Sequence, residues 1–153
     1  MGPEMTKHEA MLPQFIQLNL KARDKAGLLN LLSETAAHFT GLDKSAILVA
    51  LCKREALGST GVGNAIALPH TSIFGLESPF GLLALLNHPI DFGSVDAKPV
   101  ETVFVLLTPQ NDAASDLALL SAIARRFRSG DLVSTLRKAT TEAEALAAWN
   151  DLA

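Results

Sequence analysis

Apolar and polar residues alternate near the start of the chain, in the segment QFIQLNLKA at residues 14–22. A period of two is typical of a β-strand that is buried on one face. Two later segments are apolar almost throughout, SPFGLLALLNHPI at 78–90 and VETVFVLLTP at 100–109. Such continuous runs predict strands buried on both faces, which requires helices on both sides of the sheet.

Apolar residues spaced by three and four positions predict two helices after the first strand. Asp24 is a suitable N-cap for the first of these helices, and Gly41 is a suitable stop. Asp43 is placed to cap the second helix, which we expect to end at Gly58. Aspartate oxygens accept hydrogen bonds from the free N–H groups at a helix start, and glycine suits the left-handed residue that often follows a helix end.

Three further helices are predicted in the C-terminal part of the chain. In NDAASDLALLSAIARRF, we expect the residues that face the sheet to be Leu117, Leu120, Ala124 and Phe127. The segments SGDLVSTLRKA and TEAEALAAWNDL follow as two short helices.

The order of these elements predicts the fold class. One strand, two helices, several buried strands and three helices indicate an α/β fold, a single three-layer α/β/α domain with a central mixed sheet of about five strands flanked by helices. We expect this domain to span residues 12–153, and residues 1–11 to be a loose N-terminal segment.

The composition narrows the class of protein. A net charge of −3 and the lack of a basic run argue against nucleic acid as a partner. The longest apolar runs fall short of the roughly 20 residues of a membrane helix, and the start lacks a secretion signal, so we expect a cytoplasmic protein without membrane insertion. Cys52, the only cysteine, is interpreted as a small buried side chain and fits a reducing compartment.

The segment GSTGVGNAIALPHTS, residues 58–72, is the first candidate for chemistry. A P-loop would need lysine after Gly63, where Asn64 stands, and a dinucleotide fingerprint would need glycine in place of Ile66. From spacing alone the glycines are turn residues. The alternative is that their backbone N–H groups cradle an anion.

His70 is the second candidate. It follows a predicted buried strand at 65–68 and Pro69, and ligand sites of α/β sheets gather at strand ends. A neutral imidazole is available as a nucleophile near pH 7, although an ordinary loop histidine remains the alternative. No serine-hydrolase elbow and no cluster of metal ligands is found in the sequence, so neither a metal nor a cofactor is expected.

Two blocks of sequence resemble a known family. REALGSTGVGNAIALPH at 54–70 resembles the active-site signature of the enzyme IIA proteins of the phosphoenolpyruvate-dependent phosphotransferase system, in the fructose/mannitol/nitrogen-regulatory group. HPIDFGSVDAKPVETVFVLLTP at 88–109 resembles the next block of that family. The similarity covers roughly residues 12–150 and is greatest to the nitrogen-regulatory branch.

The resemblance implies roles for particular residues. His70 would accept a phosphoryl group from a small histidine phosphocarrier protein, and the guanidinium of Arg54 would stabilise that group. The resemblance and the chemistry of their groups also suggest four phosphate-binding residues: Ser59, Thr60, Gly61 and Gly63.

The sequence departs from the family pattern at three positions. Asp116 stands where the relatives have a histidine near the phosphoacceptor, Ser72 where they often have a basic residue, and Ala65 where glycine is usual. A carboxylate would repel a phosphoryl group, so we expect slower or less stable phosphorylation of His70. Two alternatives for Asp116 are a hydrogen bond that orients His70 and a favourable position at a helix start.

Three functions remain open from the sequence. The first is a phosphoryl-transfer regulatory protein, whose phosphorylation state controls partners such as transporters or sensor kinases. The second is a sugar-transport enzyme IIA that passes phosphate to a IIB component. The third is a degenerate, non-catalytic binding module. In the first two cases the protein is a phosphoryl carrier rather than an independent enzyme.

Overall fold

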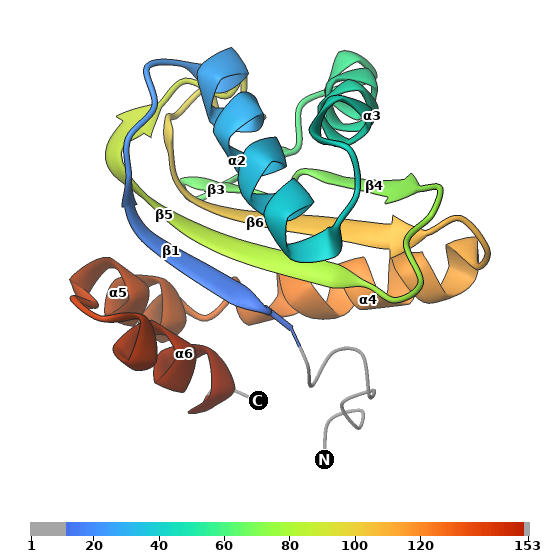
Figure 1. Ribbon diagram of the computed structural model, residues 1–153. Helices are drawn as coiled ribbons and strands as arrows, with labels where there is room; N and C mark the ends of the chain where they lie inside the picture. The colour runs from blue at the N-terminus through green and yellow to red at the C-terminus, as the bar shows by residue number, and fades with distance from the viewer. Residues whose placement is uncertain (1–11, 152–153) are drawn as a thin grey trace.

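A six-stranded sheet with helices on both faces makes up the computed structural model, which describes residues 12–151 (Figure 1). The segment 1–11, expected to be loose, lies outside the described residues. The strands are β1 (Phe15–Leu20), β2 (Gly61–Gly63), β3 (Ile66–Ala67), β4 (His70–Ile73), β5 (Phe80–Ile90) and β6 (Val100–Pro109). The helices are α2 (Lys25–Thr40), α3 (Lys44–Ala56), α4 (Ala113–Arg126), α5 (Gly130–Lys138) and α6 (Glu142–Asp151).

The sheet is mixed, as predicted. Its strands follow the order β1-β5-β6-β3-β2, with β4 also paired to β6. β5 and β6 are antiparallel, whereas β1 runs parallel to β5, and β3 and β4 run parallel to β6. The long apolar strands β5 and β6 lie inside the sheet, where both of their faces are covered.

β3 and β4 form one interrupted line along β6. Ala67 pairs with Val103 and His70 pairs with Leu106, so both strands keep the same register on β6. The break falls at Pro69, which has no N–H to donate to a neighbouring strand. His70 therefore opens a second strand, rather than standing beyond the end of the sheet.

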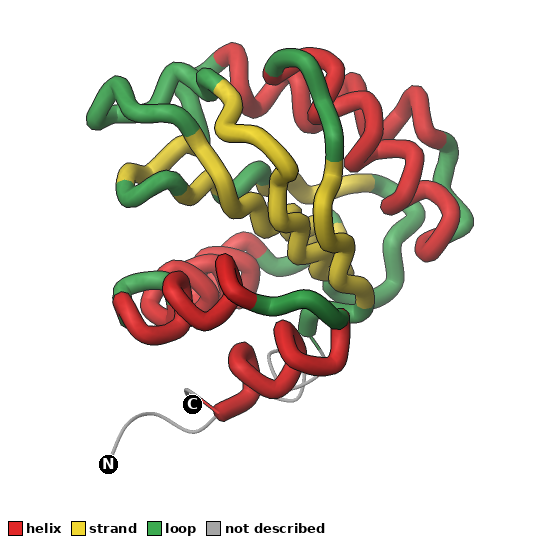
Figure 2. The backbone as a smooth tube through the Cα atoms, turned by 90° about the vertical axis from the view of Figure 1, so that its left-hand side faces the viewer, coloured by secondary structure: helices red, strands yellow, loops and turns green. Residues whose placement is uncertain are grey.

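Helices α2 and α3 cover one face of the sheet, and α4, α5 and α6 cover the other (Figures 1 and 2). Successive residues of β6 point to opposite faces of the sheet and so contribute to the hydrophobic core on each side. Val103 and Val105 pack with the leucines of α2, and Phe104 and Leu106 pack with α4, α5 and the ring of Trp149. Burial of each such side chain contributes about 1.5–3 kcal/mol. The predicted three-layer arrangement is confirmed.

The predicted caps of the first two helices are also confirmed. The side chain of Asp24 accepts a hydrogen bond from the N–H of Gly27 at 2.8 Å, and that of Asp43 accepts one from Ala46 at 3.2 Å. Gly41 ends α2 in the left-handed region, with φ of 75°.

The structure corrects two predictions about burial. On α4, Leu119, Ala122 and Ile123 are buried against the sheet, whereas the expected Leu117 is 65% exposed. Of the other expected residues, Phe127 is buried as predicted, and Leu120 and Ala124 are half-buried against the same core. Closely spaced leucines allow more than one set of positions with helical spacing, so the sequence pattern alone did not determine which side of α4 faces the sheet. On α3, Leu51 faces the sheet, and Cys52, one helical step further round, is exposed rather than buried.

Candidate functional site

Three of the predicted site residues meet at one depression of about 350 Å³. Arg54 comes from the last turn of α3, His70 from the start of β4, and Asp116 from the first turn of α4. The other residues that line the depression are Thr71, Ser72, Leu106, Thr108, Ala113, Leu117 and Leu120. Segments that are far apart in the sequence thus bring a histidine, a guanidinium and a carboxylate together.

The imidazole of His70 is held in one tautomer. Its Nδ1 lies 2.7 Å from the backbone oxygen of Leu68. A carbonyl oxygen only accepts hydrogen bonds, so Nδ1 carries the proton. The other nitrogen, Nε2, then keeps its lone pair, and the Nε–H of Arg54 points at it from 3.4 Å. Nε2 is therefore the nucleophilic atom of the ring.

The surroundings of His70 lower its pKa below the ordinary value. Burial is the main cause because it disfavours the charged imidazolium. The hydrogen bond to Leu68 and the charge of Glu55 act in the opposite direction, and the charge of Arg54 lowers the pKa further. A lowered pKa keeps the ring neutral, with the Nε2 lone pair available, at neutral pH.

Neighbouring residues at the end of α3 hold the backbone around the site. Arg54 Nη1 donates to the carbonyl of Gly58 at 2.9 Å. The Glu55 carboxylate, only 6% exposed, pairs with the Lys25 ammonium at 2.6 Å and accepts bonds from the N–H and hydroxyl of Thr60. These contacts tie the end of α3 to α2 and to the segment before β2, so Arg54 is presented from a fixed turn.

The serine and the threonine of the predicted phosphate-binding set have other partners. The Ser59 hydroxyl donates to the carbonyl of Phe92 at 2.7 Å and accepts from the N–H of Gly61 at 3.0 Å. The Thr60 hydroxyl donates to Glu55. Among residues 12–151, the lining of the His70 depression includes none of Ser59, Thr60, Gly61 and Gly63. Their phosphate-binding role stays a prediction.

The two glycines have structural reasons of their own. A Cβ on Gly61 would collide with the side chain of Ser94, so β2 and the 91–98 segment approach closely only with glycine there. Gly63 has φ of 101°, a conformation that side chains rarely adopt. The predicted turn role therefore fits Gly63, whereas Gly61 lies in β2 and allows close packing against Ser94.

Asp116 lines the depression, but it is not the partner that orients the ring of His70. Leu68 already accepts the hydrogen bond that sets the ring of His70, and Arg54 faces the other ring nitrogen. The backbone N–H of Asp116 donates to the carbonyl of Asp112, as expected in the first turn of α4. Sequence reasoning missed the role of Leu68 because it belongs to a backbone atom.

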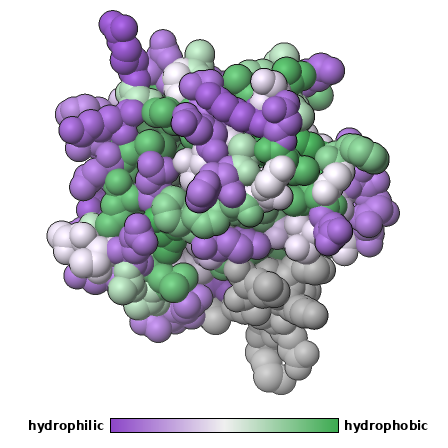
Figure 3. Space-filling view, viewed as in Figure 1, coloured by the Kyte–Doolittle hydropathy of each residue, from purple (hydrophilic) through white to green (hydrophobic). Residues whose placement is uncertain are grey.

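An exposed apolar rim adjoins the site, made of Val49, Leu57, Phe74 and Leu117. Three of these residues line a groove of about 730 Å³ between α3 and β4, which shares Arg54, Thr71 and Ser72 with the His70 depression. Hydrophobic surface is visible on the side of α3 and β4 in Figure 3. Exposed apolar patches of this kind mark surfaces that bind other proteins.

Comparisons with known proteins agree with this geometry. Residues 10–151 match the family model described as "Phosphoenolpyruvate-dependent sugar phosphotransferase system, EIIA 2". The chain is 41% identical over 143 residues to a nitrogen regulatory protein of Bradyrhizobium diazoefficiens, covering 94% of this chain and 90% of that protein. A nitrogen regulatory protein of Pseudomonas aeruginosa is 40% identical over 126 residues, covering 82% of this chain and 79% of the relative.

Solved structures show the same fold. The nitrogen regulatory protein IIA-Ntr of Neisseria meningitidis superposes with a TM-score of 0.82 at 27% identity, covering 88% of this chain and 92% of that one. The mannitol enzyme IIA of Escherichia coli, solved in complex with phosphorylated enzyme IIB, gives a TM-score of 0.75 at 16% identity, covering 89% and 94%. Within residues 12–151, no helix has the length and apolar character needed to span a membrane.

Proposed function

Because the chain belongs to the EIIA 2 family of the phosphoenolpyruvate-dependent phosphotransferase system, as a homologue of its nitrogen-regulatory members, we propose that His70 is the phosphoacceptor of this phosphoryl-transfer regulatory protein. The main support for this assignment is the hydrogen bonding of the two imidazole nitrogens. Its Nδ1 is bonded to Leu68, and its Nε2 faces a guanidinium in an open depression.

The proposed transfer uses the lone pair of Nε2. This pair attacks the phosphorus of a phosphohistidine on the donor protein, and the electron pair of the breaking N–P bond stays on the donor nitrogen. The proton on Nδ1 of His70 remains in place, and the Leu68 carbonyl stabilises the positive ring that results. Such a transfer consists mainly of positioning and of stabilising charge on the phosphoryl oxygens.

Arg54 is proposed to stabilise those oxygens. Its Nε lies 3.4 Å from Nε2, in the space from which phosphorus must approach, so the side chain has to shift as the N–P bond forms. After the shift its planar set of donors can face two phosphoryl oxygens at once. The carboxylate of Asp116, which also lines the depression, is proposed to repel the charge of the phosphoryl group.

The proposed donor is a small histidine phosphocarrier protein, which we expect to dock on the rim made of Val49, Leu57, Phe74 and Leu117. We propose that the phosphorylation state is then read by regulatory targets in the cytoplasm, such as transporters or sensor kinases. Similarity to nitrogen regulatory proteins over most of the chain supports this reading over transfer to a sugar-specific IIB component.

The test is phosphorylation of the full chain by phosphoenolpyruvate, enzyme I and the phosphocarrier, followed by intact-mass measurement. The wild type should gain one acid-labile phosphoryl group and His70→Ala should gain none. His88→Ala, which alters an exposed histidine of β5, is the matched control and should be labelled like the wild type. Equal labelling of His70→Ala and the wild type would refute the assignment.

A further inference from the structure

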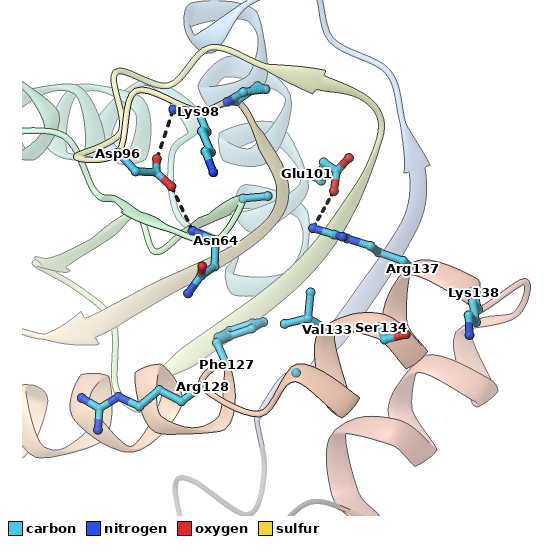
Figure 4. Close-up of a pocket in the computed structure, with 13 residues that line it drawn as sticks. Asn64, Asp96, Lys98, Glu101, Phe127, Arg128, Val133, Ser134, Arg137 and Lys138 are labelled. Atoms are coloured by element: carbon cyan, nitrogen blue, oxygen red, sulfur yellow. Dashed lines mark hydrogen bonds and ion pairs between the residues drawn. The ribbon is translucent and has the colours of Figure 1, made fainter.

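A further hollow lies between the β2–β3 turn and helix α5 (Figure 4). Its volume is about 750 Å³, within the range of pockets that hold small organic ligands. Asn64 and Lys98 lie on its strand side, and Phe127 and Val133 lie on its helix side. Among residues 12–151, its lining and that of the His70 depression have no member in common. It is therefore a separate place on the molecule.

The charge around this hollow is opposite to that of the chain. The lining contains four basic residues and two acidic ones, Lys98, Arg128, Arg137 and Lys138 against Asp96 and Glu101. The local balance is thus +2, from four minus two, on a chain of net charge −3. A concave surface with such a surplus concentrates anions.

The two acidic residues are already engaged. The Asp96 carboxylate accepts the backbone N–H groups of Asn64 and Lys98 at 3.3 and 3.1 Å. Glu101 pairs with Arg137 at 2.7 Å, but these side chains are 37% and 48% exposed. Exposed ion pairs of this kind contribute little to stability, so Arg137 can exchange Glu101 for a bound anion. Within residues 12–151, Lys98 forms no ion pair.

A buried hydroxyl without a hydrogen-bond partner lies next to the hollow. A smaller hollow of about 240 Å³ shares Glu101 and Arg137 with the larger one and is lined by Thr102. Thr102 is 1% exposed, and among the described residues its Oγ1 has no hydrogen-bond partner. Buried polar atoms in native proteins are nearly always paired, so this hydroxyl is an available partner for a group that enters the smaller hollow.

We propose that the two adjoining hollows bind a small organic anion. Lys98 and Arg137 would take its carboxylate or phosphate group, and the apolar side chains of Phe127 and Val133 would contact its body. The amide of Asn64 and the hydroxyl of Ser134 add neutral donors on the strand and helix sides. The site includes Asn64 and Ala65, which precede β3, and it shares no lining residue with the His70 depression, so binding does not require His70.

The experiment is an NMR titration of the nitrogen-labelled full chain with two probes, phenyl phosphate and benzoate, at constant ionic strength. The amides of Asn64, Gly130 and Ser134, which line the hollow, should shift in a saturable way with at least one probe. Binding should persist unchanged in His70→Ala. Binding of either probe at these residues supports the proposal, and the stronger probe identifies the headgroup.

A pair of charge-matched variants tests the mechanism of binding. Lys98→Gln should weaken binding about tenfold, as expected for loss of one charged hydrogen bond. Lys53→Gln removes an exposed lysine of α3 that lines the other groove, and it should leave the affinity unchanged. The proposal is overturned by equal affinities of these two variants, by shifts confined to Arg54 and Thr71, or by failure of both probes.

Discussion

The Nε–H of Arg54 points at Nε2 of His70 from 3.4 Å, so the guanidinium occupies the approach to the atom proposed as nucleophile. The same side chain donates through Nη1 to the carbonyl of Gly58. A phosphoryl group on Nε2 needs the space in which Nε now lies. Phosphorylation should therefore move Arg54 and loosen its bond to the end of α3.

Removing the guanidinium should slow phosphorylation. We expect Arg54→Ala to lower the transfer rate by about 100-fold, the size of effect seen when one donor to a developing charge is lost. Arg54→Lys should recover part of this loss because it keeps the charge without the planar set of donors. The measurement is single-turnover transfer from the phosphorylated carrier. Arg23→Ala, at an exposed position before α2 and outside the groove between α3 and β4, is the control, and an equal loss in both alanine variants would contradict the prediction.

The pKa of His70 should rise in the same Arg54→Ala variant. The positive charge of Arg54 lowers that pKa in the wild type, so its removal favours the imidazolium. Proton-detected titration of the His70 ring measures the change directly. A pKa that stays the same or falls in Arg54→Ala would show that the two groups are not in contact in solution.

Stability should depend on pH through His70. Its pKa is lowered in the folded chain, so the unfolded chain binds more protons near pH 6.5, and the free energy of unfolding rises with pH in that range. As the pH falls from the unfolded pKa of about 6.5 toward the lower folded value, stability is lost. The free energy of unfolding, measured with denaturant at several pH values in this window, should change less with pH in His70→Ala than in the wild type. An equal dependence on pH in the two proteins would contradict the argument that burial lowers the pKa of His70.

The charge of Asp116 should shorten the lifetime of the phosphorylated form. We expect Asp116→Asn to lengthen the half-life on the order of fivefold, from the roughly 1 kcal/mol of a screened charge pair. Asp116→His should lengthen it at least as much, since an imidazole can also donate to the phosphoryl oxygens. Loss of label from purified phosphoprotein is the measurement. Half-lives that do not exceed that of the wild type would show that the carboxylate does not act on the phosphoryl group.

Ala65 should carry backbone strain that glycine would relieve. It has φ of 64°, the left-handed region that costs L-residues roughly 1–2 kcal/mol. After the greater freedom of glycine in the unfolded chain is subtracted, Ala65→Gly should raise the free energy of unfolding by up to about 1 kcal/mol. Ala67→Gly, at a buried position of β3, should lower it. A destabilised Ala65→Gly in chemical denaturation would contradict this account.

The sequence predicted the fold well where a pattern is local. Alternation and apolar runs gave β1, β5 and β6, and the caps Asp24 and Asp43 marked the starts of α2 and α3. The inner face of α4 was not predictable, since Leu117 and Leu119 satisfy the same periodicity in different phases. The sheet decides between them, and it is built from distant segments.

The candidate site was predictable only in part. His70 was a candidate from its place after a predicted strand and Pro69, whereas Arg54 and Asp116 were singled out through the family resemblance. All three line one depression. The partner of Ser59 is the carbonyl of Phe92, 33 positions along the chain, and the partner of His70 Nδ1 is the carbonyl of Leu68. Backbone oxygens carry no sequence signal, so these contacts emerge only from the fold.

The most direct test locates the phosphorus atom. The protein, labelled with nitrogen-15 in its histidines and phosphorylated through the carrier, can be analysed by phosphorus–nitrogen coupling at neutral pH. We expect coupling to Nε2 of His70 alone, with Nδ1 still protonated and bonded to Leu68. Phosphorus on Nδ1 of His70, or on any other residue, would contradict it.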